Sequence, residues 1–76
     1  MKRYFFDVVG GDRPELDYSG RILPTPESAR DAAELLAFDR AVKSDGETIG
    51  WSVNVLVAEG RKLFSIPIQH SYLVGT

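Results

Sequence analysis

The chain has 76 residues, of which 43% are hydrophobic, and a formal net charge of −2 at neutral pH. It contains no Cys and one His, His70, so disulfides and a Cys/His zinc site are excluded. The near balance of charges argues against a broad nucleic-acid footprint, and no apolar run approaches the roughly 20 residues of a membrane span. We therefore expect a single soluble domain over residues 1–76, cytoplasmic and of a bacterial kind, without a cofactor.

The N-terminal part predicts two strands joined by a polar loop. Residues 3–9 are rich in aromatic and β-branched side chains and end at a Gly-Gly turn, which is typical of a strand. The loop at 10–17 carries three carboxylates, interpreted as solvated acids because a calcium loop needs more ligands at defined spacing. Residues 18–23 predict a short second strand, with Ile22 packed inward beside Leu16. The side chains of the first strand expected to face the core are Tyr4, Phe6 and Val8.

The stretch that follows predicts the only convincing helix. Thr25 is a good N-cap, and Pro26 suits the first helical position, where its missing N–H costs nothing. Lys43 suits the last turn, and Gly46 can adopt the left-handed cap conformation. The small-residue stripe expected to lie against a sheet is Ala29, Ala32, Ala33 and Leu36. Phe38 points away from that stripe, so either a loop or the C-terminal tail covers it, or it contacts a partner.

The C-terminal part predicts a second hairpin. Residues 51–57 alternate, with Trp51 and three valines inward, and residues 62–68 form the last strand after a short turn. Pro67 cannot donate to a neighbouring strand and therefore favours a sheet edge. Residues 69–76 form a tail. The predicted fold class is α+β, ββαββ, with a four-stranded antiparallel sheet in the order second, first, third, fourth, and the helix packed on one face.

The sheet face turned away from the helix carries more apolar side chains than a solvated face needs. The expected patch consists of Phe5, Val9, Leu56 and Leu63. Exposed apolar patches tend to be interfaces. We therefore predict a homodimer formed through this face or through an edge strand, with Phe38 as a further candidate interface residue.

Several different short motifs are spread along residues 3–68. They are RYFF from Arg3, D-x-x-G at Asp17–Gly20, Leu23-Pro24, the helix with Ala29-Arg30 and Ala33, Gly50-Trp51, the EGR turn and LFSIPI. Together they resemble a family of small proteins of unknown function from rhizobia and related alphaproteobacteria. The resemblance implies a bacterial, cytoplasmic, stand-alone domain, and it brings no activity or catalytic residues.

A weaker similarity is to the RNase-H-like domain of HicB-type antitoxins. Those domains also begin with an aromatic strand, turn through a Gly/Asp loop and enter an alanine-rich helix after a T-x-E-like cap. Here Thr25-Pro26-Glu27 and Ala32-Ala33 fill those places.

Catalysis is not expected. An enzyme needs a nucleophile with a base, a metal, or paired carboxylates in a pocket, and the serines lack a nucleophile-elbow context. Gly10-Gly11 is not a phosphate loop, so no catalytic, cofactor-binding or metal residue is assigned. The leading prediction is a non-catalytic protein-interaction or regulatory module. The alternative is a nucleic-acid-binding or antitoxin-like regulator, with bases stacked on Phe5 and the backbone near Arg3 and Lys62.

Overall fold

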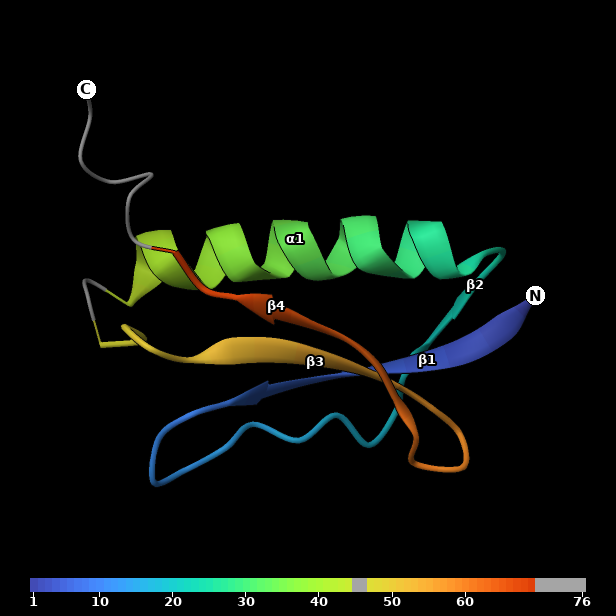
Figure 1. Ribbon diagram of the computed structural model, residues 1–76, viewed down its shortest axis with the longest axis horizontal. Coiled ribbons are helices and arrows are strands. Elements are labelled where there is room, and N and C mark those ends of the chain that lie inside the picture. The colour runs from blue at the N-terminus through green and yellow to red at the C-terminus, as the bar shows by residue number, and fades with distance from the viewer. Residues whose placement is uncertain (45–46, 70–76) are drawn as a thin grey trace.

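The computed structural model describes residues 1–44 and 47–69. Within them the elements are β1 (Lys2–Val9), β2 (Arg21–Leu23), α1 (Pro26–Lys43), β3 (Ser52–Val57) and β4 (Lys62–Pro67). The strands form one antiparallel sheet in the order β2-β1-β3-β4, and α1 runs along one face of it (Figure 1). The predicted α+β class, ββαββ element order and strand order are confirmed.

Helix α1 begins where the local sequence indicates. Thr25 is the N-cap, and its Oγ1 accepts the Ser28 N–H at 3.0 Å while its own N–H donates to Ser28 Oγ at 3.2 Å. This reciprocal capping box satisfies donors that the first turn leaves without intrahelical partners. At the other end the C-cap is Ser44, whose N–H donates to Arg40 O at 2.9 Å. Gly46, the expected cap, lies outside the described residues.

The core lies between α1 and the inner face of the sheet. Its members from the sheet side are Tyr4, Phe6, Val8, Val53, Val55, Val57 and Ile68. The fully buried side chains of the helix are all alanines: Ala29, Ala33, Ala37 and Ala41. All four residues of the predicted stripe pack against the core: Ala29 and Ala33 are fully buried, and Ala32 and Leu36 are half-buried at its margin. The helix packs along a row of residues four apart, which small side chains allow to lie close to the sheet.

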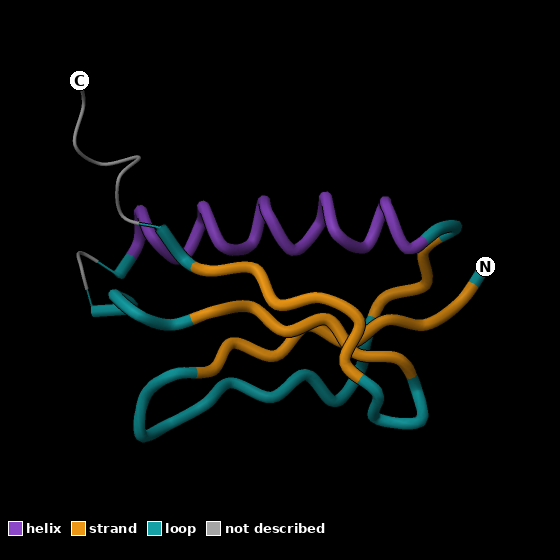
Figure 2. The backbone as a smooth tube through the Cα atoms, in the orientation of Figure 1, coloured by secondary structure: helices purple, strands orange, loops and turns teal. Residues whose placement is uncertain are grey.

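The loop after β1 runs back beside that strand (Figure 2). Val8 and Glu15 form an isolated antiparallel bridge, with N–H···O distances of 2.9 and 2.8 Å. Gly10 and Gly11 turn the chain against Trp51. A Cβ at Gly10 would lie 2.7 Å from Trp51 Cα, and one at Gly11 would lie 2.1 Å from Trp51 Cζ2. Gly10 also has a φ of 137°, so this turn requires glycine.

Strand β2 is shorter than the predicted 18–23 and presents the opposite side chains to the core. Arg3 pairs with Ile22, so Ile22 shares the outer face with Arg3, and Leu23 faces the helix. The prediction that Ile22 and Leu16 pack inward is wrong, because they are 48% and 47% exposed. A shift of one residue in register moves every side chain of a strand to the other face.

Strands β3 and β4 pair with an irregularity in register. The shift falls between Val55 and Leu56 of β3 and leaves Leu63 of β4 as the extra residue. Leu63 is half-buried and packs against the core cluster. It therefore does not lie in one patch with Phe5, Val9 and Leu56, as the sequence analysis predicted. Pro67 ends β4, which is an edge strand of the sheet as predicted.

Candidate functional site

The outer face of the sheet, turned away from α1, holds part of the patch expected from the sequence. Phe5 on β1 lies directly opposite Leu56 on β3, and Val9 follows further along β1. All three side chains are half-buried, and Ile22 of β2 adds an exposed apolar side chain to the same face. A shallow cleft of about 200 Å³ opens beside Phe5 and Leu56. The structure therefore brings these two residues together, with Leu63 set apart.

Asp17 forms a set of hydrogen bonds that joins β1 to the loop before β2. Its Oδ2 accepts the Phe6 N–H at 3.1 Å, and its Oδ1 accepts the N–H groups of Gly20 at 2.9 Å and Ser19 at 3.1 Å. Asp7 Oδ1 in turn accepts the Asp17 N–H at 2.9 Å. Burial by itself raises the pKa of Asp17, but the three N–H donors outweigh it and hold the pKa below its usual value. The D-x-x-G motif is thus a structural turn that sets the register of β2.

The remaining loop acids show no metal-site geometry. Glu15 Oε1 lies 2.8 Å from Arg40 Nη2 and pairs the loop with α1. In residues 1–44 and 47–69, no group of three or more His, Cys, Asp or Glu side chains is placed to hold a metal ion. His70 lies outside these residues. Within the same ranges, no helix has the length and apolar character needed to cross a membrane.

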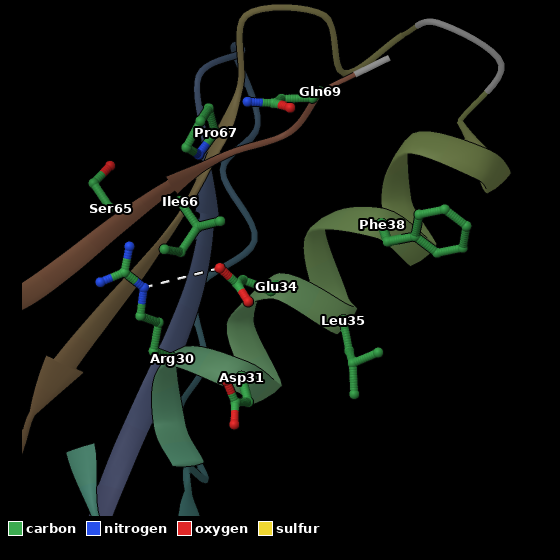
Figure 3. Close-up of a pocket in the computed structure, with 9 residues that line it drawn as sticks. All are labelled: Arg30, Asp31, Glu34, Leu35, Phe38, Ser65, Ile66, Pro67 and Gln69. Carbon is green, nitrogen blue, oxygen red and sulfur yellow. Dashed lines mark ion pairs between the residues drawn. The ribbon is translucent and has the colours of Figure 1, made fainter. Parts of the chain in front are cut away.

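A second surface lies on the side of α1 turned away from the sheet. Leu35, Phe38 and Val42 are 72%, 47% and 49% exposed, and their spacing of three and four residues places them along one line of the helix. Leu35 and Phe38 also line the rim of a groove between α1 and β4 (Figure 3). We refer to these three residues as the α1 apolar stripe. The sequence prediction singled out Phe38 alone, although the same spacing could have added Leu35 and Val42.

A groove of about 690 Å³ separates α1 from β4 beside this stripe. Arg30 and Glu34 point into it from the helix (Figure 3), with Arg30 Nε 3.9 Å from Glu34 Oε2. The Arg30 guanidinium lies over the Phe64 ring, 5.6 Å from its centroid. Ser65 and Ile66 line the opposite wall. Because β4 is an edge strand, its outer side has no strand partner among the described residues.

In the part of the chain that the structure describes, the fold is a two-layer α+β domain in which one helix covers one face of a four-stranded sheet. The chain belongs to the DUF6894 family, a domain of unknown function whose model matches residues 3–69. No curated protein and no solved structure matches the chain. The expected membership in a family of unknown function is confirmed. The alphaproteobacterial origin and the HicB similarity stay predictions.

Proposed function

We propose that this domain is a non-catalytic protein-interaction module that binds its partner through the α1 apolar stripe. The observation that carries this proposal is the exposure of Leu35 and Val42 on a helix whose opposite face is already fully buried. The helix cannot rotate to hide the stripe without exposing its alanine face. Covering the stripe removes apolar surface from water, which is favourable by roughly 25 cal/mol per Å².

The neighbouring groove and the edge of β4, which has no strand partner in residues 1–44 and 47–69, support the same location. A partner on the stripe would have the α1–β4 groove within reach, and the edge of β4 offers backbone groups for an added strand. By contrast, Phe5, Val9 and Leu56 on the outer sheet face are already half-buried. Each side chain of the α1 apolar stripe is therefore more exposed than these three. We place the action of the module in the cytoplasm, where a domain without Cys needs no oxidising environment.

Nucleic-acid binding has less support. Arg3, which was expected near a nucleic-acid backbone, donates from its Nη1 to Ser19 O at 2.7 Å. Asp7, an acidic residue, lies on the same sheet face as Phe5. A salt-dependent shift with single-stranded RNA is expected to show no binding even at low salt, where the electrostatic contribution is largest.

Photo-crosslinking tests the interaction role. Benzoyl-phenylalanine replaces Leu35 in one variant and Tyr18, an exposed residue of the β1–β2 loop, in a matched control. Irradiation in the cells that make the protein is expected to yield a discrete protein adduct from position 35 and none from position 18. The same adducts from both positions, or none from position 35, would contradict the proposal.

A homodimer through the outer sheet face is the second candidate. It is favoured by the direct cross-strand pair of Phe5 and Leu56 and by the exposure of Ile22 beside them. Two copies joined face to face in this way would carry their α1 helices on the outside. The dimer and the helix-mediated interaction are thus compatible.

Light scattering after gel filtration measures this dimer directly. At about 50 μM the expected mass is twice the 8.4 kDa of one chain. Leu56→Lys is expected to give a monomer, because a charge buried in an apolar interface costs several kcal/mol. Leu35→Lys, which places the same charge on the helix, is expected to leave the dimer intact. A monomeric wild-type protein at this concentration would rule the dimer out.

A further inference from the structure

The charges around the α1 apolar stripe are unevenly distributed. At 100° per residue, four carboxylates lie within about 75° of the centre of the stripe, whereas the three basic residues of the helix lie more than about 100° from it. The carboxylates are Glu27, Asp31, Glu34 and Asp39, and the basic residues are Arg30, Arg40 and Lys43. The stripe is therefore bordered by negative charge.

The basic residues of α1 do not neutralise this border. Arg40 pairs with Glu15. Arg30 lies over the Phe64 ring, and its Nε is 3.9 Å from Glu34 Oε2, a long contact between two exposed groups that offsets little of the Glu34 charge. Lys43 Nζ lies 3.2 Å from Asp39 Oδ1 and balances that carboxylate alone. Across the described residues, Glu27 and Asp31 form no ion pair. Negative charge therefore remains at the N-terminal end of the stripe.

The helix dipole accounts for only part of this charge. A carboxylate in the first turn is stabilised by the positive end of the helix, which explains Glu27. The effect falls off within that turn, so it does not explain Asp31 or Glu34. Asp31 lies one turn before Leu35, in line with the stripe. The face thus consists of an acidic half followed by an apolar half.

A second copy of the chain fits this face poorly. In a parallel arrangement, Asp31 of one helix would meet the same residue of the other. In an antiparallel arrangement, Asp31 would be buried against Leu35 or Val42. The parallel arrangement places a charge against a like charge, and the antiparallel arrangement buries a charge in an apolar contact. Both are energetically costly.

We propose that the α1 apolar stripe binds a basic amphipathic helix of another protein, with Lys or Arg side chains facing Asp31 and Glu34. This inference rests on the proposed interaction function and names the chemistry of its partner. The distance along the helix from Glu27 to Val42 is about 22 Å, which a partner helix of about 15 residues spans. Apolar residues of that helix cover Leu35 and Val42, as in other helix-to-helix recognition.

Two synthetic peptides test this charge preference. The first is a labelled 16-residue helix with Leu on one face and Lys on the other, and the second has Glu in place of every Lys. In 50 mM salt, fluorescence anisotropy is expected to show binding of the Lys peptide at least tenfold tighter than that of the Glu peptide. The difference shrinks as salt is raised, because screening weakens exposed charge pairs.

Charge-reversal variants locate the binding surface. Asp31→Lys combined with Glu34→Lys is expected to weaken binding of the Lys peptide at least tenfold. Asp12→Lys combined with Glu59→Lys makes the same change in net charge at exposed positions away from α1 and is expected to alter binding less than twofold. Leu35→Asn is expected to weaken binding of the Lys peptide at least fivefold. Circular dichroism verifies that each variant is folded.

Two outcomes overturn the inference: equal binding of both peptides, including no binding of either, or equal losses in the two double variants. If position 35 still crosslinks to a protein in the cell in that case, the interaction function stands and only the basic partner is wrong. If position 35 gives no adduct either, the proposed function falls as well.

Discussion

Replacing Gly10 by Ala is expected to lower the free energy of unfolding by about 3 kcal/mol, a larger effect than that of any other substitution proposed for this domain. Its φ of 137° is one that L-residues rarely adopt, and the new Cβ would lie 2.7 Å from Trp51 Cα. Because Trp51 Cα belongs to the backbone, it cannot turn aside as a side chain can. A domain of this length has a net stability on the order of 4–10 kcal/mol, so the loss is a large fraction of the total.

The matched control for this substitution is Gly60→Ala. Gly60 also has a positive φ, 89°, but a Cβ added there would have no atom within 4 Å outside the adjoining residues, so a loss of only about 1 kcal/mol is expected. Urea unfolding followed by the fluorescence of Trp51, the single tryptophan, measures both variants. Equal losses would show that the close approach to Trp51 contributes nothing to stability.

Asp17→Asn is expected to destabilise the domain by about 2 kcal/mol at neutral pH. The amide retains one acceptor oxygen, but its NH₂ group must face a backbone N–H that now points at the carboxylate. The pKa of Asp17 is lowered in the folded protein, so its contribution is fully present above the unfolded-state pKa of about 3.9 and is lost as the pH falls through the folded-state value.

Urea unfolding between pH 7 and pH 2.5 checks this sign. The wild-type protein is expected to lose stability below about pH 4, and Asp17→Asn is expected to lose less over the same range. Asp12→Asn removes an exposed acid of the same loop and is expected to behave as the wild type. An acid dependence in Asp17→Asn as steep as in the wild type would refute the assignment.

The sequence predicts the features that a few neighbouring residues decide. Thr25 and Pro26 determine the start of α1 through local capping, and Pro67 indicates the sheet edge because it lacks a donor. The face on which Ile22 lies could not be predicted in this way. It depends on the hydrogen bonds that Asp17 accepts from N–H groups of the turn before β2. A difference of one residue in that turn would move each side chain of β2 to the opposite face of the sheet.

The packing of the helix and the candidate surface were also only partly predictable. Residues three and four positions apart are both neighbours on a helix, so the sequence did not decide between Ala32 and Ala37 as members of the buried row; the angle between helix and sheet decides it. The exposure of Leu35 and Val42, which flank that row in sequence, depends on the neighbours that the fold supplies. Those neighbours come from distant parts of the chain.

The row of buried alanines has a consequence for how α1 is positioned along its own axis. Four identical side chains spaced one turn apart present nearly the same surface to the sheet after a slide of about 6 Å. The row therefore determines the distance between helix and sheet, but it does not determine the position of the helix along its axis. That position is set by contacts near the ends and flank of the helix: the Thr25 cap, Arg30 over the Phe64 ring, and Arg40 paired with Glu15. In this domain polar contacts locate the helix, and the apolar core determines how closely it lies to the sheet.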